Sequence, residues 1–237
     1  MIKISSRIEP IIKPKNKIPT IETFNKKLGR LITTHSSDSY NPQWVKTEIK
    51  NSFGKTLGYE MFSLNSNSHK GCGATMEVEK EYRQRGLKIG EVLRLSSIIG
   101  IMENEISEFE IYSKPSAIYF HSKYKFEPAI TRFEERDNTL LAIITNSKKG
   151  YEDFKEEAET LLEEASRDKN SEKQRKLCED TNSLVKKYIQ KVLETEDGYK
   201  NHPFQQGIRM ILTKDEIIKN KDFFNSLFIK HGINYKI

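Results

Sequence analysis

The sequence predicts an α+β fold, in which a mixed, mostly antiparallel sheet is flanked by helices, with an added C-terminal helical segment. Three observations support this prediction. From 44 to 145, segments with an apolar residue at every second position alternate with segments that repeat apolar residues every three or four positions. A short turn at 52–55 joins two alternating segments, as in an antiparallel hairpin. Beyond 148, highly charged segments keep one apolar stripe, which is typical of helices that expose one face.

The central elements follow from local patterns along the chain. Segments 44–51 and 56–64 alternate and form the hairpin, and 71–82 adds a third strand. Segment 87–104 carries the apolar stripe of a helix. The remaining central elements are a strand at 107–113, a short helix at 115–124 that begins with proline, and strand candidates at 126–133 and 139–145. Strands that alternate with helices in this way indicate a mixed sheet.

The last third of the chain predicts helices at 151–166 and 173–194 and a strand at 207–213. Thr213 and Glu216 have the spacing of a capping box, which starts a last helix that runs to about His231. Two arrangements stay open. Either 148–200 is a helical insertion before a final strand, or 139–145 closes the sheet and the rest is an appendage.

These elements divide the chain into four parts. Residues 1–30 form a basic N-terminal arm and a short helix, and 31–147 form the core. Residues 148–206 form the helical insertion or appendage, and 207–237 form the final strand and C-terminal helix. The short helix is placed at 20–31, because Phe24, Leu28 and Leu31 have the spacing of one helical face.

Composition narrows the class of protein. The 237 residues are 35% hydrophobic and 31% charged, with twelve Phe and ten Tyr, which is enough for a core in one large domain. No apolar run approaches the roughly 18–20 residues that span a bilayer, and the N-terminus lacks the apolar region of a secretory signal. We therefore expect a soluble, cytoplasmic protein without membrane contact. Two widely spaced cysteines predict free thiols rather than a disulfide framework.

The net charge of +6 lies in the N-terminal arm, since 1–30 holds eight Lys or Arg and two Glu. This excess is compatible with weak nucleic-acid contact. A solvated tail is the simpler interpretation, because no aromatic residues are interleaved with the charges.

The segment that points to chemistry is 76–90, where a strand runs into a helix through Arg83, Gln84, Arg85 and Gly86. Free amides at a helix N-terminus bind phosphate oxygens, and a glycine lets the ligand approach the backbone closely. The neighbouring basic side chains add positive charge. Neither the Walker pattern nor the dinucleotide-binding GxGxxG pattern is present.

This segment resembles the acyl-CoA loop of the GNAT family of N-acetyltransferases, Arg/Gln-x-x-Gly-x-Gly/Ala, which follows a strand with a Val five residues before the Arg. Val78, Arg83 and Gly86 match, whereas Lys88 stands in place of the second Gly or Ala. A second block, 117–128, resembles the family's A-I-x-F-Y-E-K-x-G-F-E-P, with matches at Ala117, Ile118, Phe120, Lys123, Phe126, Glu127 and Pro128. In this block His121, Ser122 and Lys125 replace Tyr, Glu and Gly. The resemblance covers about 44–145.

The resemblance implies direct transfer of an acetyl group from acetyl-CoA, as co-substrate, to an amine acceptor in a ternary complex. It implies a cofactor-binding set of Met76, Val78, Arg83, Gln84, Arg85, Gly86, Leu87, Lys88, Ser116 and Lys123. His121 takes the place of the tyrosine that protonates the leaving thiolate, and Glu60 or Glu77 is the candidate general base. No metal is expected, because the histidines have no ligand spacing.

Two other functions fit the sequence. The departures from the family pattern at Lys88, His121 and Lys125 fit a catalytically inactive relative that binds CoA or acts as an interaction protein. The basic arm fits an RNA- or ribosome-binding protein. The acceptor amine and the oligomeric state stay open, because a shared fold does not choose among substrates.

Overall fold

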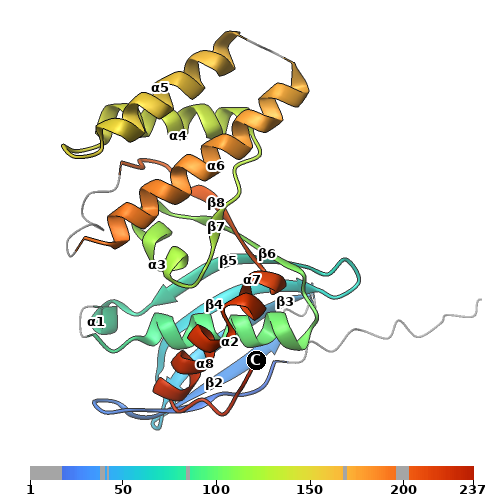
Figure 1. Cartoon of the computed structure of the whole chain (residues 1–237). Helices are drawn as coiled ribbons and strands as arrows, with labels where there is room; N and C mark the ends of the chain where they lie inside the picture. Colours follow the sequence, from blue (N-terminus) through green and yellow to red (C-terminus); the bar gives the residue numbers. More distant parts are fainter. Residues whose placement is uncertain (1–17, 38–40, 42, 84–85, 168–169, 196–202) are drawn as a thin grey trace, which may run out of the picture.

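The computed structural model describes residues 18–37, 41, 43–83, 86–167, 170–195 and 203–237. Its centre is an eight-stranded sheet of order β1-β2-β3-β4-β5-β6-β8-β7, shown in Figure 1. Every neighbouring pair of strands is antiparallel except β5 and β6, which are parallel. Helices flank this sheet, so the predicted α+β class with a mostly antiparallel mixed sheet is confirmed.

The strands are β1 (Glu22–Asn25), β2 (Gly29–Ser37), β3 (Trp44–Asn51), β4 (Thr56–Asn65), β5 (Lys70–Val78), β6 (Glu108–Ser113), β7 (Glu127–Pro128) and β8 (Ile208–Thr213). The helices are α1 (Lys80–Arg83), α2 (Ile89–Glu103), the 3-10 turn η1 (Pro115–Ala117), α3 (Ile118–Lys123), α4 (Phe133–Asn146), α5 (Glu152–Arg167), α6 (Ser171–Leu193), α7 (Lys214–Lys219) and α8 (Lys221–Lys230). Of the part predicted as a basic arm and short helix, 1–30, residues 1–17 lie outside the described residues.

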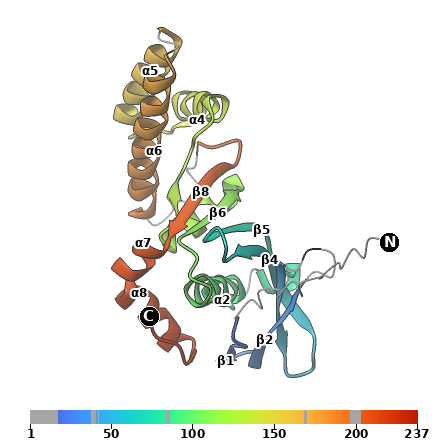
Figure 2. The ribbon, with the colours of Figure 1, turned by 90° about the vertical axis from the view of Figure 1, so that its right-hand side faces the viewer.

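Helix α2 is the central helix of the molecule. It packs against the sheet on one side, and the chain around α8 lies on its other side, as Figure 2 shows. This double cover explains why α2 is buried from Val92 through Ile101, since a helix that is apolar on all sides needs partners all round. At its N-terminal end, Glu91 accepts from Lys230 and His231 at the end of α8.

The predicted helix at 20–31 is wrong, because this segment forms the hairpin β1–β2. Asn25 turns the chain by accepting from the amides of Lys27 and Leu28, and Gly29 follows with φ +73°. Leu31 is buried in the core, whereas Phe24 is 73% exposed. The three apolar residues therefore never share a helical face, and pairing of β2 with β3 overrides the local pattern.

The strand predicted at 139–145 is also wrong, because α4 covers it. Leu140 and Ile143 are three positions apart and both buried, as on one side of a helix. In the sequence, the continuous apolar run at 140–144 does not distinguish this helical period from that of a buried strand. The strand predicted at 126–133 shrinks to the two residues of β7, and the strand predicted to reach Tyr82 ends at Val78, before α1.

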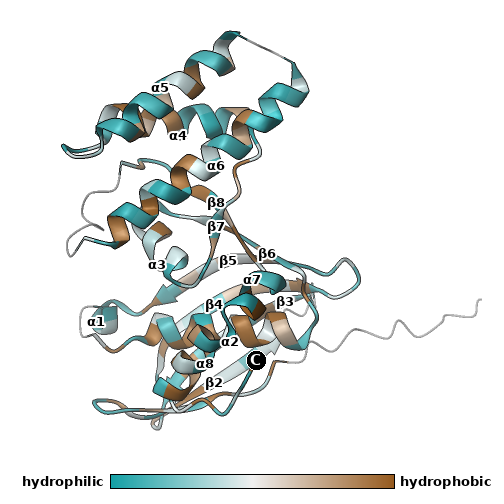
Figure 3. Cartoon of the chain, in the orientation of Figure 1, coloured by the Kyte–Doolittle hydropathy of each residue, from teal (hydrophilic) through white to brown (hydrophobic). Residues whose placement is uncertain are grey.

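Strand β8 lies between β6 and β7 and pairs with both. Helices α4, α5 and α6 therefore stand in the chain between two adjacent strands, and they gather at one end of the molecule (Figure 1). Their outer faces are hydrophilic, as Figure 3 shows for α5. Their inner faces bury apolar side chains, among them Ala158, Leu184 and Tyr188.

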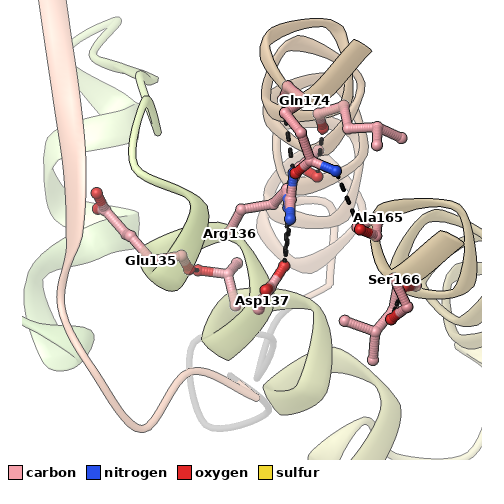
Figure 4. Close-up of polar contacts among 10 residues, drawn as sticks. Glu135, Arg136, Asp137, Ala165, Ser166 and Gln174 are labelled. Carbon is pink, nitrogen blue, oxygen red and sulfur yellow. Dashed lines mark hydrogen bonds and ion pairs between the residues drawn. The ribbon is translucent and has the colours of Figure 1, made fainter. Parts of the chain in front are cut away.

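A buried arginine ties these three helices together (Figure 4). Arg136 of α4 donates to the Gln174 side-chain oxygen of α6 at 2.6 Å, and Gln174 donates to the carbonyl of Ala165 in α5 at 3.0 Å. Asp137 pairs with the same guanidinium at 2.7 Å. The buried charge of Arg136 is thus paired and hydrogen-bonded within the bundle, so its role there is structural.

Candidate functional site

The sheet opens between its two parallel strands. β5 and β6 are in register only from Lys70 opposite Glu108 to Gly73 opposite Ile111. Beyond that point β5 continues to Val78 along β4, while β6 continues to Ser113 along β8. An irregularity in the β4–β5 register, between Met61 and Phe62, lies where the strands separate and bends β5. No strand among the described residues pairs with the facing backbone edge of 74–78, so this edge, apart from the Val78 carbonyl that Arg83 occupies, is available to an extended ligand.

A cavity of about 120 Å³ lies at this opening. It is bounded by β5 and β6, by β4 and α2 at its floor, and by η1 and α3 at its side. Its lining consists of Glu60, Gly73, Ala74, Thr75, Met76, Arg94, Ile111, Tyr112, Lys114, Ala117 and His121. Two candidates from the sequence, Glu60 and His121, therefore reach the same cavity, although they stand far apart in the chain.

Glu60 lies at the floor of the cavity and is only 2% exposed. Its Oε1 pairs with Arg94 Nη1 at 2.9 Å, and among the described residues its Oε2 has no hydrogen-bond partner. Burial raises the pKa of the Glu60 carboxyl to about 7, against the opposing charge of Arg94 and a hydrogen bond from Ser97. A carboxyl poised near neutral pH suits a general base.

His121 is 8% exposed and lines the same cavity from α3. Its Nδ1 lies 3.3 Å from Arg94 Nη2, and its ring packs against Phe126 at 5.6 Å between centroids. Burial, together with the charge of Arg94, lowers the pKa of His121 well below its ordinary value. The ring is therefore neutral at physiological pH, which disfavours the imidazolium proton donor expected from the sequence.

Glu77 stands on the opposite face of the sheet from Glu60. Tyr59 is opposite Glu77 and Glu60 is opposite Met76, and successive residues of a strand point to opposite faces. The Glu77 carboxylate accepts from Tyr59 at 3.1 Å and pairs with Arg83 at 2.7 Å. It does not line the cavity, so geometry favours Glu60 over Glu77 as the base.

The loop between β5 and α2 carries the expected phosphate-binding features in part. Gly86 has φ +61°, and Lys88, directly before α2, has φ +57°. The amides of Glu91 and Val92 donate to the Lys88 carbonyl and form the first hydrogen bonds of α2. The amides of Ile89 and Gly90 come before these bonds, as the first amides of a helix do. Lys88, which stands in place of the second Gly or Ala of the loop pattern, therefore adopts the left-handed backbone conformation that glycine favours.

The other residues of the predicted cofactor-binding set are placed differently. Arg83 is engaged locally, since it donates to the Val78 carbonyl at 2.5 Å and pairs with Glu77. Leu87 is a buried core side chain, and its carbonyl accepts from Asn25. Ser116 and Lys123 are exposed and lie outside the cavity lining, as does Val78, whereas Met76 lines the cavity. Gln84 and Arg85 lie outside the described residues.

A carboxylate at the start of α2 is neutralised by its neighbours. Glu91 accepts from Tyr124 at 2.8 Å and from Lys230 at 2.8 Å, and it pairs with His231. Burial raises the pKa of Glu91, but these hydrogen bonds outweigh burial and hold the pKa well below its ordinary value. The charge of Lys230 offsets the repulsion that an isolated Glu91 carboxylate would exert on an anion at this helix end.

Arg94 is the residue that sequence reasoning missed. It joins Glu60 to His121 and is 2% exposed. The available signal is one arginine within the apolar run of α2, since a charge on a fully buried helix needs a partner. Within the part of the chain that the structure describes, no helix is both long and apolar enough to cross a membrane, and no cluster of His, Cys, Asp and Glu is fit to hold a metal ion.

No family model matches the chain, and no curated protein matches it. Similar solved structures include GCN5 from Tetrahymena, a GNAT-family acetyltransferase from Staphylococcus aureus, and the PaiA N-acetyltransferase from Thermoplasma acidophilum in complex with coenzyme A. They are 16%, 26% and 17% identical to this chain, with TM-scores of 0.35, 0.34 and 0.32. The alignments cover 39%, 38% and 38% of this chain and 57%, 56% and 55% of those chains, so the matched part spans less than two thirds of their length. Over that part, the chain resembles solved GNAT acetyltransferases, the family whose two sequence blocks it also resembles.

Proposed function

We propose that this protein is an N-acetyltransferase that transfers an acetyl group from acetyl-CoA to an amine. The observation that carries the proposal is that β5 separates from β6 and that a cavity lies at this opening. The chain after β5 then leads through a loop into the N-terminus of α2. An open strand edge, a buried carboxyl and a helix N-terminus along one path match the three parts of an acyl-CoA molecule.

Each part of acetyl-CoA has a proposed binding group. The amides of the pantetheine arm pair with the backbone edge of 74–77, as an added strand does, since Arg83 already occupies the Val78 carbonyl. The pyrophosphate takes the amides that follow Gly86 at the start of α2, with Lys88 as a nearby cation. The thioester then lies in the cavity over Glu60 and His121.

The reaction that these groups support is direct acyl transfer. The neutral amine nitrogen attacks the thioester carbon, a C–N bond forms, and the amine loses a proton to Glu60. The C–S bond then breaks and its electron pair leaves with the sulfur of CoA. Glu60 is the proposed base because its Oε2 has no partner among the described residues and its carboxyl titrates near neutral pH.

A thermal melt with acetyl-CoA, CoA and ATP in parallel tests the cofactor. Ligand that binds only the native state raises the melting temperature, by roughly 5–10 °C at a concentration of about 100 times its Kd. We expect this rise with both CoA forms and none with ATP. Gly86→Glu is expected to remove it, because the new carboxylate repels the pyrophosphate.

Gly150→Glu is the matched control for this experiment. Gly150 also has a positive φ, +93°, and no heavy atom lies within 4 Å of a Cβ built on it, but it lies between α4 and α5, away from the cavity. It should therefore keep the full rise. No rise with acetyl-CoA at millimolar concentration contradicts the proposal. A rise without thiol release on any of a panel of amines favours the inactive CoA-binding alternative.

A further inference from the structure

The contact between Arg94 and His121 determines which ring nitrogen carries the proton. Arg94 Nη2 lies 3.3 Å from His121 Nδ1. A guanidinium group has only donors, so the histidine nitrogen that meets it must accept. A neutral imidazole that accepts at Nδ1 carries its hydrogen on Nε2.

Contacts from three other residues hold the Arg94 guanidinium beside His121. Its Nη1 pairs with Glu60 of β4 at 2.9 Å and donates to Ser97, one turn further along α2, at 3.2 Å. Its guanidinium carbon lies 4.9 Å from the centre of the Phe126 ring. The side chain is 2% exposed, so water does not compete for its donors.

We propose that Arg94 is a positioning residue that fixes His121 as the neutral Nε2–H tautomer, so that this N–H donates a hydrogen bond to a ligand in the cavity that both residues line. The identity of the ligand rests on the proposed function. In that case the bond stabilises the negative charge that develops on the thioester oxygen and then on the departing sulfur. The proton stays on Nε2 throughout.

This assignment differs from the role that the sequence suggested for His121. Proton transfer from an imidazolium requires two positive charges 3.3 Å apart in a buried setting. Glu60 offsets one of them, and its contact is to Arg94 rather than to His121. A neutral N–H donor needs no second charge, so the network supports hydrogen bonding rather than acid catalysis.

The test is a nitrogen-15 NMR measurement of the histidine rings in the protein without ligand. The His121 signals are identified by their loss in His121→Gln. In the wild type we expect Nδ1 unprotonated and Nε2 protonated near pH 7.5, with imidazolium formed only well below the ordinary histidine pKa of about 6.5. A protonated Nδ1 in the wild type, or an imidazolium near neutral pH, overturns the proposal.

The variant Arg94→Met/Glu60→Gln removes both charges together, so neither is left unpaired in the core. We expect its His121 to show a mixture of tautomers and to become charged at a higher pH than in the wild type, because the charge of Arg94 is gone while burial remains. Spectra unchanged from the wild type contradict the role of Arg94. Arg136→Met is the matched control, because Arg136 is also 2% exposed but lies in the helical bundle, and it should leave the His121 signals unchanged.

A kinetic measurement tests the donation to substrate. His121→Gln is expected to lower kcat by about 100-fold with little change in KM for acetyl-CoA, as for loss of one transition-state donor. An unchanged kcat in an active enzyme contradicts the donation. If the melts show no CoA binding while the NMR result is as expected, the proposed function fails and the tautomer assignment stands.

Discussion

Glu60 and Arg94 form a 2.9 Å ion pair in which neither side chain is more than 3% exposed. Glu60 comes from β4 and Arg94 from α2, so the pair joins the sheet to the helix that covers it. A buried pair adds little net stability, because desolvation offsets attraction. Removal of one partner is costly, because the other charge stays buried without compensation.

We therefore predict that Arg94→Met destabilises the protein by about 3–5 kcal/mol. Arg94→Met/Glu60→Gln should recover most of this loss, because no charge is left alone. The measurement is urea unfolding of the two variants and of Glu60→Gln near pH 8, analysed as a double-mutant cycle. Strictly additive losses would show that the two side chains are not coupled.

The raised pKa of Glu60 predicts a pH dependence of stability. Its carboxyl titrates at about 7 in the folded protein and at 4.5 as a model group, so the folded state holds the proton more tightly. The resulting stabilisation is complete below pH 4.5 and is lost as the pH rises through about 7. In urea unfolding, the free energy of unfolding of the wild type should therefore fall relative to that of Glu60→Gln as the pH rises over this interval. A constant difference between the two would contradict the shift.

His121 predicts the opposite sign. Burial lowers its pKa below the ordinary 6.5, so the unfolded state takes up the proton first. The contribution of His121 is present above pH 6.5 and is lost as the pH falls through the lowered pKa. Compared with His121→Gln, the wild type should lose stability between about pH 7.5 and pH 5.5 in urea unfolding. If the free energy of unfolding changed with pH equally in the two proteins, the buried neutral His121 ring would be refuted.

The cavity can be filled without touching its charged floor. Ala117 lines it at the end of η1 and is only partly buried. Ala117→Phe should occupy much of the 120 Å³ and abolish the rise in melting temperature with acetyl-CoA. The unliganded protein should keep its melting temperature within a few degrees, because the ring enters an existing space. Retention of the full rise would place the thioester elsewhere.

The cap of α7 gives a test of the local structure around the final strand. Thr213 Oγ1 accepts from the Glu216 amide at 3.1 Å, as the capping box predicts. The reciprocal half of the box is replaced, because the Glu216 carboxylate accepts from Asn220 at 2.7 Å. Thr213→Ala should cost about 1 kcal/mol in urea unfolding, and the neighbouring Lys214→Ala should cost much less. Equal effects would argue against the cap.

Elements with one clear local period were predicted well. β3 and β4 alternate over most of their length, and α5 and α6 each carry one stripe between charged faces, so local pattern and tertiary environment agree. The errors fall where a pattern fits two structures. Phe24, Leu28 and Leu31 fit a helix as well as a hairpin, and the run around Leu140 fits a strand as well as a buried helix.

The candidate site divides in the same way. The local pattern predicted the strand before Gly86 and the helix after it, because periodicity acts over a few neighbouring residues, but it missed the turn α1 between them. The sequence also identified Glu60 and His121 as single candidates. The contact of Arg94 with both of them, and the position of Glu77 on the other face of the sheet, became evident from the folded chain alone. These contacts depend on strand register and on the packing of β4, α2 and α3. Register and packing are set by segments that are far apart in the sequence, so no local pattern reports them.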